Sequence, residues 1–368
     1  MMTRSLGLMM AASVTGMLGF FLLFSTVPLY AATGGSGATG AGLATGAMMA
    51  STVLAELAVP WLLSRHGYRA AMALGLLLLG LPALLLPLSA ELPVVLAVSL
   101  LRGAGLGVLV VTGTALTADL VPAERRGEGL GLYGLAVGVP SVAGLPLGLW
   151  AADVLGFAPV LVVAGLLPLA GLVAVTGLPA ARPVTAGGGG RTGGGLAAPM
   201  LVFASVTVSV GVLVTFLPLA GTPALASAAM LAQSLATPTA RWWAGRFGDR
   251  RGPATLLVPG LLAAAAGTAL QAWTDAPVPV VAGMALFGAG FGVLQNATLT
   301  LMLQRGEPAR VSALWNLAYD AGMGVGATGF GLVLGHTGYR LGFVLVAALI
   351  AVTIPLARVR PAYAPLPQ

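Results

Sequence analysis

Three ionisable side chains lie inside long apolar segments. Burying a charge there costs free energy, so such residues are candidates for a functional role. Arg102 stands among Leu, Gly and Val residues, and Glu56 and Asp320 have similar surroundings. An arginine at the centre of a membrane helix costs at least ~2.5–3.5 kcal/mol on insertion scales. A carboxyl group in such a low-dielectric site can take up and release a proton, and this would switch any pairing with the arginine. Arg102, Glu56 and Asp320 are therefore our candidates for proton coupling.

These residues also have structural interpretations. Arg102 could extend to the outer surface or bind carbonyl groups at a helix end. Glu56 lies within ten residues of Arg65 and could face the aqueous side near a helix end. Asp320 is placed deeper in its segment and is the better candidate of the two acids.

Polar and aromatic side chains also gather in the segments 277–303 and 309–334. Trp315 and Tyr319 are four positions apart, as are Asn316 and Asp320, so these side chains share one broad helix face. In an apolar helix such a face should point to the bundle interior or to a water-filled cavity. We predict a substrate-binding site there; hydrogen bonding between helices is the alternative. Its expected members are Gln295, Asn296, Trp315, Asn316 and Tyr319.

The composition indicates that the elements carrying these residues span a membrane. Of all residues 58% are hydrophobic and 7% charged, against roughly 25% charged in a soluble domain. Apolar runs of about 20 residues are long enough to cross the hydrocarbon layer as helices. A cleaved signal peptide is a weaker interpretation of the first run, which is longer than a typical one. The sequence contains twelve such runs, at 6–30, 40–63, 69–88, 93–118, 128–151, 156–178, 198–219, 222–244, 254–273, 277–303, 309–334 and 339–357. The Gly-rich residues 33–42 are the expected outer loop between the first two helices.

The arginines orient these helices. The net charge of +7 comes from arginine, since the sequence contains no lysine. With a cytoplasmic N-terminus, nearly every arginine falls at a cytoplasmic helix end, and only Arg102 and Arg340 do not. We therefore expect both termini in the cytoplasm and a multi-pass protein of the inner (plasma) membrane. Abundant Ala, Gly, Arg and Pro without Lys indicate a bacterium with a GC-rich genome.

The chain contains an internal repeat. Residues 101–109 read LRGAGLGVL, and 185 positions later 286–294 read LFGAGFGVL. The same offset relates 64–67 to 249–252, and Arg125 to Arg310. A sequence rich in Gly, Ala and Leu produces chance matches, but three landmarks with one offset favour a duplicated design, which we predict. The expected parts are a six-helix half at 1–178, a flexible Gly-rich cytoplasmic linker at 179–198, and a second six-helix half at 199–368.

Two short segments between predicted helices combine arginines with glycine. Residues 245–252 read GRFGDRRG, which resembles the loop signature G-x(3)-D-R-x-G of the major facilitator superfamily. Residues 63–69 read LSRHGYR and resemble a degraded copy, in which Ser64 replaces the usual Asp. Ion pairs there would join helices in one conformation and release them in another; a positively charged anchor is the alternative. The gating residues that the resemblance implies are Arg65, Gly67, Arg69, Gly245, Arg246, Asp249, Arg250 and Gly252.

Three further motifs resemble the same superfamily. Arg102 with the glycines after it resembles the helix-four signature of proton-coupled members, and its repeat partner is Phe287, so the shared scaffold needs no arginine there. The run from Pro122 resembles P-x-x-R-R-G-E-x-x-G of drug exporters. The antiporter signature of helix five, G-x(3)-G-P-x(2)-G, has an imperfect counterpart, for which tight packing through small residues is the alternative. Its residues are Gly138, Pro140, Gly144 and Gly148.

The resemblance covers almost the whole chain and implies an all-α integral membrane protein with the major facilitator fold. Its cavity would lie between the two halves near the bilayer midplane. We expect a secondary transporter that exports a small apolar or amphipathic compound, a drug or secondary metabolite, in exchange for protons, as multidrug-resistance antiporters do. Uptake of a nutrient, metabolite or sugar is the closest alternative, and a transport-inactive receptor or structural protein is the second.

Missing residue types argue against other classes. A Walker sequence needs a lysine, so an ATP-driven pump is excluded. The chain has no cysteine and two histidines, too few for the usual zinc site, and no Asp-rich motif or His/Asp centre that a membrane enzyme would need. We expect no enzymatic activity, no metal and no cofactor, with the proton gradient as driving force. The expected partners are the substrate, protons and the lipid bilayer, without nucleic acid, and the expected state is a monomer.

Overall fold

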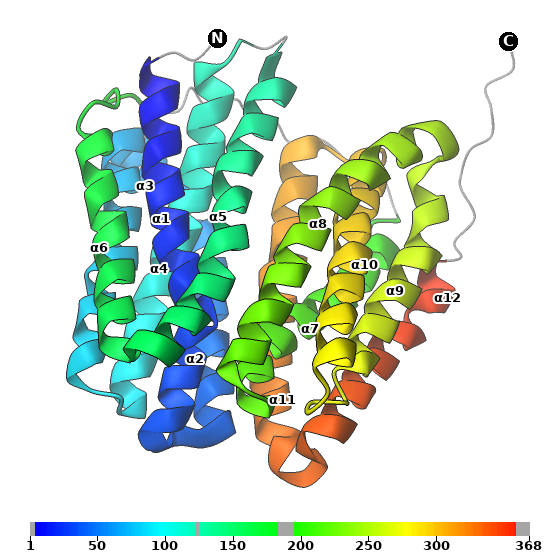
Figure 1. Ribbon diagram of the computed structural model, residues 1–368. Coiled ribbons are helices and arrows are strands. Elements are labelled where there is room, and N and C mark those ends of the chain that lie inside the picture. The colour runs from blue at the N-terminus through cyan, green and yellow to red at the C-terminus, as the bar shows by residue number, and fades with distance from the viewer. Residues whose placement is uncertain (1–3, 123–124, 183–194, 358–368) are drawn as a thin grey trace, which may run out of the picture. The chain divides into compact units, whose positions relative to one another are not determined.

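The computed structural model describes residues 4–122, 125–182 and 195–357 (Figure 1). Every regular element in these ranges is a helix. A helix satisfies its own backbone N–H and C=O groups, which lipid cannot do, so long apolar runs of this kind fold as helices in a bilayer. The predicted fold class, an all-α integral membrane protein, is confirmed.

The helices follow the apolar runs of the sequence. Those before residue 183 are α1 (Arg4–Phe24), α2 (Thr26–Ala31), the π-helical turn η1 (Ala32–Ser36), α3 (Gly37–Gly80), the 3-10 helix η2 (Pro82–Leu88), α4 (Leu92–Leu120), α5 (Arg126–Leu155) and α6 (Phe157–Val175). Those after residue 194 are α7 (Ala197–Ala220), α8 (Pro223–Arg251), the 3-10 helix η4 (Pro253–Leu256), α9 (Leu257–Leu270), α10 (Pro277–Leu303), α11 (Pro308–Val352) and α12 (Ile354–Ala357).

Each predicted span coincides with a helical segment, although two pairs of spans run on from one to the next. α3 contains the second predicted span and most of the third, and its backbone turns at Gly67, where φ is 78°. α11 contains the eleventh predicted span and most of the twelfth, and it turns at Gly338, where φ is 67°. Glycine adopts such angles without strain, so these two residues permit reversals that need no loop.

The outer loop expected from the Gly-rich residues 33–42 is much shorter than we predicted. Helical structure continues through η1, and α3 begins at Gly37. The chain reverses around Gly35 and Gly37, whose φ angles are 104° and 58°. The predicted extent of the loop was wrong because glycine allowed a tight turn here.

Eight stretches of the described residues are long and apolar enough to cross a membrane. Two of these stretches, Arg4–Leu88 and Arg310–Ala357, are long enough to hold several of the predicted spans. α8 is not among the eight stretches: Gln, Ser, Thr and Pro interrupt its apolar part, and most of its charges lie near its C-terminal end. The chain is a multi-pass membrane protein.

The contacts divide the chain into two compact units that cut across the order of the sequence. Unit 1 comprises 1–188, 210–231 and 323–338, and unit 2 comprises 189–209, 232–322 and 339–368. Unit 1 therefore includes parts of α7, α8 and α11 as well as α1–α6. Its buried core includes Leu23, Val98 and Leu161, which come from α1, α4 and α6. The two sequence halves that we predicted remain a prediction.

The internal repeat reappears as equivalent helix contacts in the two units. An ideal Cβ at Gly105 would lie 2.7 Å from the Gly75 carbonyl oxygen, and one at Gly290 would lie 2.6 Å from that of Gly260. Gly75 and Gly260 are themselves 185 positions apart. The neighbouring glycines make the same kind of contact. In unit 1, ideal Cβ atoms at Gly103 and Gly107 would meet the backbone of Met48 and Thr52. In unit 2, those at their repeat partners Gly288 and Gly292 would meet the backbone of Gln233 and Thr237. The repeated motif thus brings α4 and α10 into backbone contact with their neighbours.

Candidate functional site

Arg102 lies in α4 and is 1% exposed, which makes it one of the largest fully buried side chains. Its Nε donates to the carbonyl of Leu79 in α3 at 3.4 Å, and one Nη donates to the carbonyl of Gly19 in α1 at 3.5 Å. Both hydrogen bonds are long, and a guanidinium has five N–H donors. Within the described residues no ion pair holds Arg102, so it retains capacity for an anionic partner.

Glu56 lies on α3 and faces α4, because its Cγ lies 3.2 Å from the ideal Cβ position of Gly107. Its side chain is partly buried. Gly107 follows Arg102 by five positions, which places the two residues roughly 140° apart around the helix axis. In the described ranges no ion pair joins Glu56 to Arg102. Asp320 lies on α11 in unit 2 and is 8% exposed.

Aromatic side chains of α7, α10 and α11 form a cluster in unit 2. The rings of Phe203 and Trp315 stack at a centroid distance of 4.4 Å and an angle of 15°. Tyr319 lies 5.9 Å from Phe203 and 6.0 Å from Phe291. Phe287, the repeat partner of Arg102, extends the stack at 5.9 Å from Phe291. The aromatic cluster, Phe203, Phe287, Phe291, Trp315 and Tyr319, therefore includes two of the five predicted substrate-binding residues.

Polar groups border the aromatic cluster. The indole N–H of Trp315 donates to the Thr298 hydroxyl at 3.2 Å, and that hydroxyl donates to the Leu294 carbonyl at 2.6 Å. Arg241 of α8 lies in the neighbourhood of Tyr319. The aromatic cluster is therefore a mostly apolar and largely buried region with few polar groups.

The other predicted binding residues differ in exposure. Gln295 is buried, at 8% exposed. Asn296 and Asn316 are partly exposed. The Asn296 amide nitrogen lies 3.4 Å from the ideal Cβ position of Gly245, so it faces α8. Their role in binding stays a prediction.

The first predicted gating loop is a tightly packed turn. Gly67 is buried, and its ideal Cβ would lie 2.6 Å from the carbonyl oxygen of Ala181. The backbone N–H of Tyr68 donates to the same carbonyl at 3.0 Å, and the Tyr68 hydroxyl donates to the carboxylate of Asp119 in α4. Tyr68 thus ties the turn both to the end of α4 and to the start of the segment predicted as linker.

The arginines of this first loop face outwards. Arg65 and Arg69 are exposed, and the guanidinium carbon of Arg65 lies 6.0 Å from the centre of the Trp61 ring. Neither side chain forms an ion pair with a described residue. Their contribution to gating stays a prediction, as does a role as a charged anchor.

The second predicted gating segment occupies the last turns of α8, so Asp249 lies on a helix instead of in a loop. Arg246 lies over the Trp242 ring at 4.2 Å, while Asp249 and Arg250 are exposed. No ion pair joins Asp249 to an arginine among the residues described. Gly252 ends the helix with a φ of 84°, close to the 78° of its repeat partner Gly67. Both copies thus use a glycine with a positive φ angle at this position.

The helix-five signature has two kinds of glycine. Gly144 and Gly148 contact α1: an ideal Cβ at Gly144 would lie 2.6 Å from the Phe21 Cβ, and one at Gly148 would overlap the Leu22 carbonyl. Gly138 has nothing within 4 Å of that position. Pro140 is buried within the helix. The structure therefore places Gly144 and Gly148 at a helix contact and leaves Gly138 without one.

The sequence analysis did not identify several residues of these sites. Phe203 is an isolated aromatic in an apolar helix, and Asp119 contacts a tyrosine 51 positions away. Arg241 was assigned only to membrane orientation. Only Asp119 could have been noticed in the sequence, because it is an acid close to the end of a predicted span and beside the Pro122 motif.

Comparison with known proteins identifies the fold. A model of the Major Facilitator Superfamily matches residues 9–327. A bacterial homologue of the human lysosomal transporter Spinster, in an inward-facing and occupied conformation, has a TM-score of 0.78 at 13% identity, covering 97% of each chain. A POT family transporter in complex with 5-aminolevulinic acid has a TM-score of 0.77 at 12% identity, covering 96% of this chain and 95% of that one.

A third solved structure, the human organic anion transporter MFSD10, has a TM-score of 0.66 at 16% identity, covering 96% of this chain and 99% of that one. At such low identities the likeness shows the fold alone. No curated protein matches the sequence.

Proposed function

Because the chain belongs to the Major Facilitator Superfamily, we propose that it exports a small apolar or amphipathic compound in exchange for protons. The family makes the chain a membrane transporter of a small molecule, and not an enzyme. Members of the family work by alternating access to a site between two bundles. What we propose beyond family membership is the class of compound, the direction of transport and the coupling to protons.

The observation that carries the proposal is the aromatic cluster of unit 2. Phe203 and Trp315 are buried against each other, and Tyr319 is the member of the cluster that is partly exposed and can present its ring to a compound. Aromatic faces attract apolar and cationic groups alike. Thr298, Asn316 and Arg241 are the few polar residues that we assign to this site. A mostly apolar site of this kind suits an amphipathic compound better than a phosphorylated one.

Buried charges support the proton-coupled part of the proposal. Arg102 is held only by two long hydrogen bonds to carbonyl groups in the described structure, so a carboxylate could attract it. Asp320 follows Tyr319 directly and is buried, so a proton on this carboxyl group changes the charge beside the aromatic cluster. Binding of the compound and binding of the proton would then influence each other through electrostatics.

The test is proton flux in proteoliposomes that contain the purified chain. A pH gradient is imposed, and lipophilic cations or neutral antibiotics are added one at a time. We expect proton movement that depends on the compound, with loss of this movement in Asp320→Asn. The matched control is Asp275→Asn, which removes an acid that is 78% exposed and paired with Arg340 at 2.9 Å.

Each alternative result has a clear meaning. Compound movement without protons would leave a transporter and overturn the coupling. Movement of a peptide, a nucleoside or a sugar towards the inside, without movement of lipophilic compounds, would replace export by uptake. Equal effects of Asp320→Asn and Asp275→Asn would remove Asp320 from the coupling site.

A further inference from the structure

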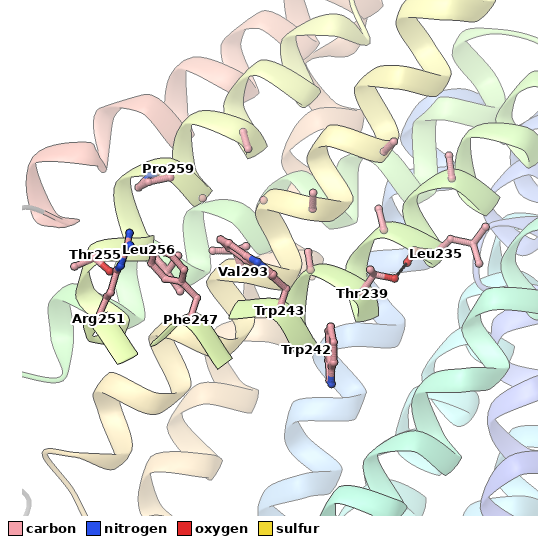
Figure 2. Close-up of a pocket in the computed structure, with 18 residues that line it drawn as sticks. Leu235, Thr239, Trp242, Trp243, Phe247, Arg251, Thr255, Leu256, Pro259 and Val293 are labelled. Carbon is pink, nitrogen blue, oxygen red and sulfur yellow. Dashed lines mark hydrogen bonds between the residues drawn. The ribbon is translucent and has the colours of Figure 1, made fainter. Parts of the chain in front are cut away.

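A groove of about 1070 Å³ runs along α8, with η4, α9 and α10 as its other walls (Figure 2). All of these residues belong to unit 2. Glycines explain its shape. Gly292 of α10 contacts α8, and Gly290 contacts α9, so both helices pack on α10. Between them small side chains, among them Ala263, Ala285 and Ala289, form most of the α9 and α10 lining.

Apart from its arginine and its two tryptophans, the groove offers an occupant apolar contacts and almost no hydrogen-bonding groups. The hydroxyl of Thr239 donates to the Leu235 carbonyl at 2.8 Å, and the hydroxyl of Thr255 donates to the Gly252 carbonyl at 2.7 Å. Both hydroxyls are thus engaged by their own backbone. Long apolar chains fit such a groove, whereas a polar solute would lose its hydrogen bonds to water.

Positive charge is concentrated at one end of the groove. Arg251 lies at this end together with Thr255, while Leu235 lies at the other (Figure 2). The guanidinium carbon of Arg251 is 5.0 Å from the centre of the Phe247 ring, which keeps the charge beside the apolar wall. Arg246 and Arg250 are close in sequence, and Asp249 is the one acid among them. The local surplus of positive charge favours an anion.

Exposed tryptophans indicate that the groove opens towards lipid. Trp242 and Trp243 are 60% and 47% exposed and line the groove. Tryptophan is enriched where the bilayer meets water, because its ring is apolar and its N–H is polar. Neither indole N–H has a hydrogen-bond partner among the described residues, so both can donate to a lipid headgroup. The arginine end would then lie at the membrane surface, on the side we predict to be cytoplasmic.

We propose that this groove binds an anionic phospholipid, with an acyl chain between α8 and α9 and the phosphate at Arg251. Basic pockets between membrane helices on the cytoplasmic side are known to hold anionic headgroups. A zwitterionic lipid lacks the net negative charge that matches the arginines. The proposal concerns a site within unit 2 and does not depend on which compound is transported.

The experiment is native mass spectrometry of the full-length purified chain, titrated with phosphatidylglycerol, cardiolipin or phosphatidylcholine. We expect saturable binding of the two anionic lipids and at least about tenfold weaker binding of phosphatidylcholine. Arg251→Gln should weaken the binding of the anionic lipids about tenfold. Arg4→Gln, which removes an exposed arginine from the start of α1, should leave that binding unchanged.

A second variant tests the apolar part of the site. Ala289→Leu places a larger side chain in the α10 lining and should exclude the acyl chain. Both groove variants must keep the melting temperature of the parent chain without added lipid, and Arg4→Gln is compared in the same way. If Ala289→Leu unfolds the chain, Ala263→Leu fills the groove from α9 instead.

Three outcomes would overturn the proposal. Equal binding in Arg251→Gln and Arg4→Gln would show that the charge at the groove has no role. Equal binding of phosphatidylglycerol and phosphatidylcholine would remove the headgroup selectivity. A dimer that is lost in Ala289→Leu, without any lipid adduct, would identify a second copy of the chain as the occupant.

Discussion

The side-chain oxygens of Thr45 and Thr215 lie 2.8 Å apart and share a hydrogen bond. Both residues are buried, and they come from α3 and α7, 170 positions apart in the sequence. Nearby, the hydroxyl of Thr39 donates to the Gly331 carbonyl at 3.3 Å, which ties α3 to α11 as well. Unit 1 is therefore closed by contacts between the early helices and segments of α7 and α11. These contacts join the two sequence halves that we predicted, and alternating access between such halves requires contacts of this kind to open in another state of the cycle.

The first prediction tests this opening with a cross-link. The chain has no cysteine, so Thr45→Cys combined with Thr215→Cys introduces the only pair. We expect oxidation to form a disulfide and to stop transport, because α3 and α7 can then no longer separate. Reduction should restore transport to the level before oxidation. Substrate flux in proteoliposomes, measured before oxidation, after it and after reduction, checks the prediction.

The matched control joins two helices of unit 2. The oxygens of Ser205 and Thr353 lie 3.2 Å apart, between α7 and the residue that separates α11 from α12. Ser205→Cys combined with Thr353→Cys should form a disulfide without stopping transport, since both residues lie in the predicted second half, 199–368, whereas Thr45 and Thr215 lie in different halves. Full transport by the cross-linked Thr45/Thr215 variant would show that the contact stays closed throughout the cycle.

The second prediction separates function from structure at Arg102. Arg102→Ala removes a buried charge that costs at least ~2.5–3.5 kcal/mol to insert, so the variant should insert as well as the parent. Its hydrogen bonds to Leu79 and Gly19 are long, and their loss should matter little to stability. Proton-coupled transport should nevertheless fall at least about tenfold, which corresponds to about 1.4 kcal/mol. Unchanged proton flux at equal protein levels would contradict a coupling role.

The third prediction concerns the glycines of α5. Gly148→Val places a side chain where the Leu22 carbonyl lies, so it should lower stability by about 1–3 kcal/mol. Gly138→Ala has open space at the corresponding position and should leave the melting temperature unchanged. Thermal unfolding of both purified variants checks this pair. A lower melting temperature for Gly138→Ala alone would reverse the assignment of the helix contact.

The sequence predicted the helices well because their cause is local. Apolar runs and their Gly or Pro breaks fix where a membrane helix begins and ends, and the bounds of α10 agree with the predicted 277–303. The repeat was also visible, since Gly105 and Gly290 need the same small size for the same backbone contact. The predicted length of the outer loop at 33–42 was wrong because glycine is compatible with a long loop and with a tight turn.

The candidate site was harder to predict because its contacts join distant positions. Trp315 and Tyr319 were found from their spacing on one helix, but Phe203 reaches them from α7, 112 positions before Trp315. Tyr68 and Asp119 meet only after α3 and α4 pack together. A side-chain pair of this kind leaves no periodic pattern in one sequence.

The last prediction concerns Asp249 at the end of α8. This acid is exposed and makes no ion pair within the described residues, so any pairing with a neighbouring arginine belongs to another conformation. Asp249→Asn should therefore leave substrate affinity within about twofold and slow turnover by up to about fivefold, the range that an exposed ion pair supports. Asp275→Asn, at another exposed acid, should change neither quantity. Binding measured by fluorescence and turnover measured as flux separate the two effects. A loss of affinity larger than the loss of turnover would place Asp249 near the substrate and end its assignment to gating.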